Sequence, residues 1–210
     1  MSKQRISRAH FRDKGITWWT REDTTPHDEF VFHKLGKMLE GRALEIGPGR
    51  GSLVFRIRDL GWRVSAIDVN REFIDHCRKK GDCTNIDFIC GDAIELPFKN
   101  GIFDAVICVD VLMHIPNPRK MFIEFSRILK PTGIILVSYL KKYSRFHIKR
   151  IFTVATGIYE RKYGKESFDY RYDSLRDIKK YIRDAKFIVS AISNRKLNPC
   201  LLMKKSSATR

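Results

Sequence analysis

The sequence predicts an α/β protein with a doubly wound, mostly parallel sheet. Short apolar runs typical of buried strands alternate with segments of helical periodicity, and the loops between them suit right-handed crossovers. The segment Ala43–Leu53 supports this most directly: an apolar run leads into Gly47, Gly49 and Gly51 and then into an amphipathic stretch. A strand, a tight glycine turn and a helix form the first unit of a nucleotide site in this fold class.

An acidic residue in this unit narrows the class of ligand. Glu45 lies two residues before the first glycine, at the point where a dinucleotide would place its pyrophosphate. A like charge there disfavours phosphate, whereas a cation is attracted to it. The predicted ligand is therefore a nucleoside that lacks phosphates and carries positive charge.

The remaining elements follow in alternation. A cap, a proline and early acids in Thr25–Glu29 predict a first helix, which we expect to end at Gly41. After the glycine turn we expect helices over Leu53–Leu60, Asn70–Lys80, Asn117–Leu129 and Asp173–Ala185, and strands over Trp62–Asp68, Ile86–Cys90, Phe103–Asp110 and Ile134–Tyr139, with Lys130–Gly133 as a break.

Two further acids lie where strands are expected to end. Asp68 closes the second strand 21 positions after Gly47, a spacing that suits hydrogen bonds from ribose hydroxyls. Asp92 follows the third strand, where it could accept a hydrogen bond from an exocyclic amino group of a base. The alternative for Asp92 is a turn aspartate that caps its own backbone.

Composition limits the remaining possibilities. The 210 residues suit one domain. The five cysteines form no CxxC pair, so we expect reduced thiols and no metal site, with Cys90 and Cys108 in buried strands. The net charge of +17 is uneven: residues 1–118 hold 18 basic and 17 acidic residues, and residues 119–210 hold 23 and 7. This excess is either a solvated face or a surface for an anionic partner, such as RNA, a membrane or an acidic substrate.

The sequence shows no targeting signal, so we expect a cytoplasmic protein. Residues 1–20 lack the apolar core of a signal peptide, and the longest apolar run, Gly133–Leu140, is too short to cross a bilayer. Attachment at the periphery of a membrane remains an open alternative because of the basic second half.

Five ordered motifs resemble those of class I S-adenosylmethionine-dependent methyltransferases. They are ALEIGPGRGSL, AIDVN, GDAIELPF, FDAVICVDVLMHI and RILKPTG, over residues 40–140, and the small-molecule type similar to ubiquinone and sterol methyltransferases matches best. Thr132 is a departure, since many relatives have a second glycine there. The resemblance implies a Rossmann-like sheet of seven strands with one antiparallel and helices on both faces, its last two strands being Phe187–Ser193 and Cys200–Lys204.

The resemblance also implies the cofactor and its site. The glycine turn would lie against the methionine portion of S-adenosylmethionine, Asp68 would hold the ribose, and Asp92 with Ala93 would border the adenine. The expected cofactor-binding residues are Glu45, Gly47, Gly49, Gly51, Asp68, Val69, Asp92, Ala93 and Asp110. The ammonium and sulfonium of this cofactor agree with the acids identified above.

The domain organisation expected is a single methyltransferase domain over residues 1–210. Residues 1–25 form an arm or lid, 26–140 the cofactor-binding core, 141–186 a basic helical cap, and 187–210 a strand pair and tail. Within the cap, Lys141–Gly164 mixes apolar and basic residues, which suits an anionic interface or a lipidic acceptor, or an RNA backbone. A cap with merely solvated charges is the third alternative.

The function expected is methyl transfer to an oxygen, nitrogen or carbon nucleophile of a small or lipid-like acceptor. His114, four residues after Asp110, is the candidate general base, because the ordinary pKa of histidine, about 6.5, suits proton removal near neutrality. Packing or positioning is the alternative role. An RNA methyltransferase and a non-catalytic nucleotide-binding regulatory subunit are the alternative functions.

Overall fold

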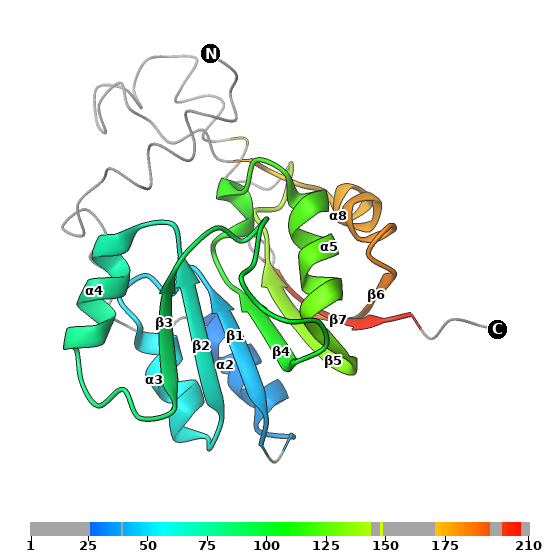
Figure 1. Ribbon diagram of the computed structural model, residues 1–210. Helices are drawn as coiled ribbons and strands as arrows, with labels where there is room; N and C mark the ends of the chain where they lie inside the picture. The colour runs from blue at the N-terminus through cyan, green and yellow to red at the C-terminus, as the bar shows by residue number, and fades with distance from the viewer. Residues whose placement is uncertain (1–25, 39, 144–147, 149–170, 194–198, 207–210) are drawn as a thin grey trace, which may run out of the picture.

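A seven-stranded sheet forms the centre of the protein (Figure 1). The computed structural model describes residues 26–38, 40–143, 148, 171–193 and 199–206. The strand order is β3-β2-β1-β4-β5-β7-β6, and β7 runs antiparallel to both of its neighbours while the other pairs are parallel. The strands are β1 (Arg42–Ile46), β2 (Arg63–Asp68), β3 (Ile86–Cys90), β4 (Phe103–Cys108), β5 (Leu129–Ser138), β6 (Phe187–Ile192) and β7 (Cys200–Lys205). In the described part of the chain, the predicted mostly parallel sheet with one antiparallel strand is confirmed.

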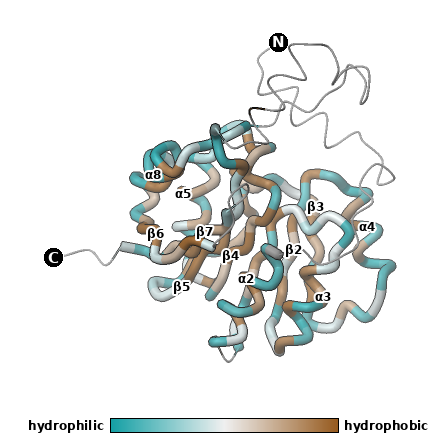
Figure 2. Tube along the Cα trace, turned by 180° about the vertical axis from the view of Figure 1, so that it is seen from behind, coloured by the Kyte–Doolittle hydropathy of each residue, from teal (hydrophilic) through white to brown (hydrophobic). Residues whose placement is uncertain are grey.

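Helices cover both faces of the sheet (Figures 1 and 2). One face carries α2 (Pro26–Leu35), α3 (Ser52–Asp59) and α4 (Arg71–Lys79), and the other carries α5 (Pro118–Ile128) and α8 (Leu175–Ile182). A short 3-10 helix, η2 (Leu112–His114), follows β4. The doubly wound arrangement places the ends of the parallel strands at one edge, where ligands bind in such folds.

Each sheet face has its own apolar core. Along β1, Ala43 belongs to the core under α2 and α3, whereas Leu44 and Ile46 belong to the core under α5. Side chains alternate between the two faces of a strand, so a strand covered on both faces is apolar throughout. This explains why the central strands are continuous apolar runs in the sequence and hydrophobic in Figure 2.

Local capping fixes where several helices begin. The Asn70 side chain accepts a hydrogen bond from Glu72 N at the start of α4, and the Asn117 side chain accepts from Lys120 N at the start of α5. In α8, Ser174 and Asp177 form a reciprocal capping box. These side chains satisfy amide groups that have no partner within the first helical turn.

Two expected boundaries between elements are wrong. The first helix ends at Leu35 and not near Gly41, because the Met38 N–H bonds to Leu35 O, three residues back, in a tight turn that replaces the helical pattern. The expected break at Lys130–Gly133 belongs to β5, which begins at Leu129 directly after α5. The pairing of β4 with β5 is irregular between Phe103 and Ala105, and this irregularity accommodates the proline and glycine within the strand.

The fourth strand and one cysteine also differ from expectation. The strand expected over Phe103–Asp110 ends at Cys108, and Asp110 has a φ of 56°, a left-handed conformation that no strand residue adopts. Cys90 is exposed, since it ends the edge strand β3, whereas Cys108 is buried as expected.

Among the described helices, none combines the length and the apolar composition that a membrane span requires. The arm expected over 1–25 and most of the cap expected over 141–186 lie outside the described residues.

Candidate functional site

The glycine turn lies close to the ends of two other strands. Gly47, Gly49 and Gly51 have φ values of 67°, 55° and 83°, in the region that favours glycine. The Gly47 N–H donates to Ile67 O on β2 at 2.8 Å, and a Cβ on Gly47 would lie 2.4 Å from Cγ2 of Val111, in the segment after β4. The turn therefore needs glycine at position 47 for its conformation and for the space it leaves.

Glu45 is a buried acid on β1, two residues before this turn. Its side chain is 5% exposed, and its Oε2 atom has no hydrogen-bond partner among the described residues. Burial, and to a smaller extent the nearby charges of Asp28 and Asp68, raise the pKa of Glu45 to about 8. A buried carboxylate oxygen without a partner is costly in free energy, so this position would be stabilised by a cationic ligand.

Asp68 ends β2, beside β1. Its Oδ1 atom accepts a hydrogen bond from Asn70 N at 2.9 Å. Burial raises the pKa of Asp68 to about 6, and this backbone hydrogen bond opposes the rise. Gly91 N donates to Asp68 O at 2.8 Å, so the segment after β3 lies against the end of β2.

Asp92 and Ala93 follow in that segment. The Asp92 Oδ1 atom accepts a hydrogen bond from Ile94 N at 3.1 Å, which is the turn interaction weighed above as its alternative role. Ala93 is buried in the core under α5. Both residues thus follow Gly91, which contacts Asp68, and Asp92 has a local structural role.

Asp110 contacts a helix that sequence reasoning did not assign to the site. The Asp110 N–H donates to Ser138 Oγ at 2.7 Å, and Ser138 Oγ lies 3.2 Å from Asp110 Oδ1. His27 Nε2, from the first turn of α2, lies 3.8 Å from the same Oδ1 atom. His27 and Asp28 are both buried polar residues, and Pro26-His27-Asp28 indicated only a helix start in the sequence. No spacing in the sequence relates His27 to Asp110, because four strands lie between them in the chain.

His114 lies at the end of η2, in the segment that follows Asp110. Its backbone N–H donates to Val111 O at 2.8 Å, and the residue is partly buried. Arg171 ties this segment to the chain before α8: its Nη2 atom donates to Leu112 O at 2.6 Å, and its Nη1 atom donates to Ile115 O. The sequence did not identify Arg171 as a site residue, because its partners lie more than fifty residues earlier in the chain.

The site as a whole is a glycine turn surrounded by acids. Glu45, Asp68 and Asp28 influence one another electrostatically, and Asp110 approaches α2 at His27. Such an arrangement suits a ligand with positive charge and hydroxyl groups, and it disfavours a polyphosphate. Within the described residues, no group of three or more acids, histidines and cysteines is placed to hold a metal ion.

The region that contains the glycine turn and the acids matches a known protein family. Residues 44–137 match the family model described as a methyltransferase domain. A ubiquinone biosynthesis O-methyltransferase of Xanthomonas oryzae pv. oryzae is 33% identical over 104 residues, which cover 48% of this chain and 44% of that protein. A ubiquinone/menaquinone biosynthesis C-methyltransferase of Wigglesworthia glossinidia brevipalpis is 29% identical over 174 residues, 73% of this chain and 69% of that one.

A solved structure supports the fold over nearly the whole length. The magnesium protoporphyrin IX methyltransferase of Synechocystis PCC 6803, crystallised with bound SAH, superposes with a TM-score of 0.69 at 19% identity and covers 98% of this chain and 100% of its own. The chain spans 30% of the length of a sterol 24-C-methyltransferase of Gibberella zeae and 44% of the length of the Xanthomonas enzyme. At this identity, the structural likeness establishes the fold alone.

Proposed function

We propose that this chain methylates a small or lipid-like acceptor, because it carries the methyltransferase domain of the class I S-adenosylmethionine-dependent family. The acceptor atom is an oxygen, nitrogen or carbon nucleophile. The related proteins named above act in ubiquinone and menaquinone biosynthesis, and this favours a small molecule over RNA.

The buried carboxyl of Glu45 is the observation that carries this proposal. Its Oε2 atom lacks a hydrogen-bond partner among the described residues, and its pKa is raised because nothing there compensates a negative charge. The cofactor brings a positive charge without a phosphate, so it supplies what Glu45 lacks. The residues present therefore fit S-adenosylmethionine, and they fit a dinucleotide poorly.

The other cofactor contacts are proposed residue by residue. Gly47, Gly49 and Gly51 let the backbone approach the methionine portion, since all three have the positive φ that favours glycine and none carries a side chain. Asp68 accepts hydrogen bonds from the ribose hydroxyls at the end of β2. Three further residues complete the proposed site: Val69, which follows Asp68, and Asp92 with Ala93, which border the adenine. Asp110 bounds the site from the segment that follows β4.

Catalysis then depends chiefly on alignment. When bound, the cofactor supplies an activated methyl group on its sulfonium. The chain's own contribution is to hold the two reactants in line and to exclude water, an effect worth about 7–11 kcal/mol of the barrier. We propose that His114 accepts the proton of an acceptor that needs to lose one.

Two measurements test the proposed function. Calorimetry with S-adenosylmethionine and with NAD should show binding of the first and none of the second; preferential binding of NAD would overturn the assignment. A methyl-transfer screen with labelled cofactor against lipid, RNA and small-metabolite fractions should label a lipid or a metabolite. Cofactor binding without transfer to any fraction would favour a non-catalytic regulatory subunit, and labelling of RNA alone would favour an RNA methyltransferase.

The uneven charge of the chain suggests where in the cell it acts and what it binds. Residues 119–210 hold 23 basic and 7 acidic residues, which favours a cytoplasmic enzyme that binds an anionic membrane surface peripherally. We also propose that residues 1–210 form one domain, with 1–25 as an arm or lid and 141–186 as a cap over the acceptor. Co-sedimentation with acidic vesicles should weaken steeply with salt, and no association at low ionic strength would contradict the membrane proposal.

A further inference from the structure

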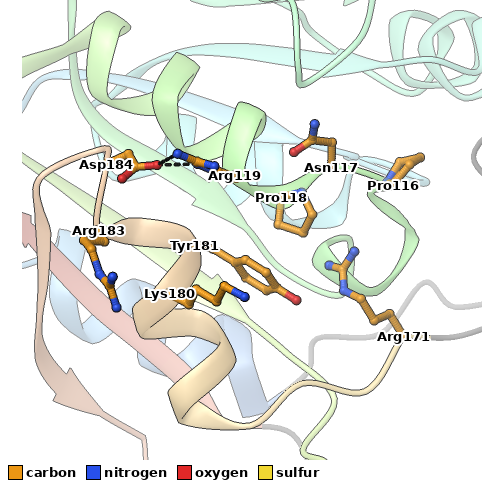
Figure 3. Close-up of a pocket in the computed structure, with 9 residues that line it drawn as sticks. All are labelled: Pro116, Asn117, Pro118, Arg119, Arg171, Lys180, Tyr181, Arg183 and Asp184. Carbon is orange, nitrogen blue, oxygen red and sulfur yellow. Dashed lines mark hydrogen bonds and ion pairs between the residues drawn. The ribbon is translucent and has the colours of Figure 1, made fainter.

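A second cavity lies between the start of α5 and the end of α8, and it shares no residue with the acidic site. Its volume is about 360 Å³ (Figure 3). Residues Pro116–Arg119 line one side, and Lys180–Asp184, apart from Ile182, line the other, with Arg171 at one end. None of these residues is among those proposed to bind the cofactor.

One part of the cavity is apolar and held in place. Pro116, Pro118 and the ring of Tyr181 line it. The Tyr181 hydroxyl donates to Asp173 Oδ1 at 2.9 Å, and Asp173 Oδ2 accepts from Arg171 Nε at 3.0 Å. Asp173 is buried, so the ring is anchored at its hydroxyl and presents its face as an apolar surface.

The rest of the cavity is strongly basic. Arg119, Arg171, Lys180 and Arg183 contribute four positive charges against the single carboxylate of Asp184. Two of the four are already paired, since Arg119 bonds to Asp184 and Arg171 to Asp173. The side chains of Lys180 and Arg183 are exposed and form no hydrogen bond or salt bridge with any residue that the structure describes. In Figure 3 Lys180 lies beside the Tyr181 ring, whereas Arg183, the residue that follows α8, lies on the side away from that ring.

The charge of this cavity is opposite to that of the cofactor site. A positively charged sulfonium nucleoside is repelled by it, whereas an anion with two negative charges matches the two cations that are not paired with a carboxylate, Lys180 and Arg183. Arginine presents a planar set of donors that suits the oxygens of a phosphate, and lysine adds a mobile point charge. The apolar side requires that the anion carry a ring or an aliphatic body.

We propose that this cavity binds an organic phosphate ester, with the phosphate between Lys180 and Arg183 and the apolar body against Tyr181 and Pro118. The phosphate displaces only solvent from these two side chains, because neither has a partner to lose. Arg119 and Arg171 are held by their carboxylate partners and form the rest of the lining. This binding does not depend on the proposed methyl transfer, since it uses other residues.

Charge-reversed variants of the full-length protein test the proposal. The site variant is Lys180→Glu with Arg183→Glu, and the matched control is Arg176→Glu with Lys179→Glu. The control residues are exposed, belong to the same helix and do not line the cavity. Both pairs change the net charge by the same amount, so non-specific attraction of anions falls equally in both. The milder pair Lys180→Gln with Arg183→Gln serves if charge reversal impairs folding.

The probe is phenyl phosphate, and its binding is measured by calorimetry. We expect saturable binding by the unmodified protein, a Kd at least about tenfold higher in the site variant, and a change below about twofold in the control. Phenol, which lacks the phosphate, should not bind. Equal loss in both variants, or no saturable binding at millimolar concentration, would overturn the proposal. Displacement by S-adenosylmethionine would also overturn it.

A second arm identifies the source of the phosphate. Vesicles that contain phosphatidic acid should bind less to the site variant than to the control if the natural ligand is a lipid headgroup. If both variants bind these vesicles alike while phenyl phosphate still discriminates between them, the ligand is a free phosphate ester.

Discussion

His27 Nε2 and Asp110 Oδ1 lie 3.8 Å apart, and this contact joins α2 to the segment that follows β4. His27 is only 2% exposed, and Asp110 also bonds to Ser138 through its backbone and its side chain. The first described helix is thereby attached to the edge of the sheet where the proposed cofactor site lies.

Replacing this histidine should destabilise the protein. His27→Ala removes the imidazole beside a largely buried carboxylate, and we expect the free energy of unfolding to fall by about 1–3 kcal/mol. Urea unfolding measures this change. His33→Ala is the control, because His33 lies on the same helix but is exposed, and it should change stability by less than about 0.5 kcal/mol. Equal stability of the two variants would show that the contact contributes nothing.

The glycine turn allows a conformational effect to be separated from a steric one. Gly47 and Gly101 have nearly the same φ, 67° and 65°, but a Cβ on Gly101 would meet no atom within 4 Å. Both alanine variants should lose about 1–2 kcal/mol of stability for the left-handed backbone. Gly47→Ala should lose more, and its Kd for S-adenosylmethionine should rise at least about tenfold, as calorimetry can measure.

A rescue variant checks the steric part. Val111→Ala in the Gly47→Ala background removes the atom that the new Cβ would meet. We expect the stability to return toward that of Gly101→Ala. If the double variant is no more stable than Gly47→Ala, the collision with Val111 is not the cause.

The buried acids predict a dependence of stability on pH. The pKa of Glu45 is raised from 4.5 to about 8 in the folded protein. Between these values the folded state binds more protons than the unfolded chain, so the free energy of unfolding falls as pH rises through this window. Glu45→Gln should flatten this dependence, and Glu29→Gln, at an exposed position of α2, should preserve it. Urea unfolding at several pH values in the window decides between these outcomes.

Cofactor affinity should depend on pH in the opposite sense. A cationic ligand binds better when Glu45 is ionised, so the affinity for S-adenosylmethionine should rise as pH increases toward about 8. In Glu45→Gln the rise should be smaller, and calorimetry at each pH measures it. An affinity that does not change with pH in the unmodified protein would contradict the proposed contact.

The proposed base can be tested without disturbing the cofactor site. His114→Gln should lower kcat by about 10²–10⁴ if His114 removes a proton in the slow step, and it should leave the Kd of S-adenosylmethionine unchanged. His33→Gln is the control for loss of a histidine. Unchanged turnover in His114→Gln would assign this residue to packing.

The sequence predicted the parts of the fold that depend on neighbouring residues. The strand over Ile86–Cys90 and the start of α5 at Asn117-Pro118 have the expected bounds, because alternation and capping act over a few positions. The break expected at Lys130–Gly133 is a bulge within β5: Phe103 of β4 is in register with Leu129, and Ala105 is in register with Ile134. Beside the bulge, Lys130 Nζ bonds to both oxygens of Asp104 at 2.9 Å. Those partners lie far away in the chain, so no local pattern reveals them.

The same division applies to the candidate site. The glycine turn and Glu45 were identified because they adjoin one another along the chain, and the structure places Asp68 close enough to Glu45 to raise its pKa. The roles of His27 and Arg171 depend on packing between distant helices and loops. Sequence periodicity carries no information about such contacts.

The position of β7 has a consequence for the order of folding. A ribosome releases β6 before β7, yet β6 pairs with β7 in the described sheet and does not reach β5 directly. Until β7 emerges, β6 lacks its partner, and two of its residues, Ile188 and Ile192, are apolar side chains that stay exposed even in the folded protein. An unpaired apolar strand is prone to self-association, so the nascent chain is most vulnerable to aggregation just before its seventh strand is made.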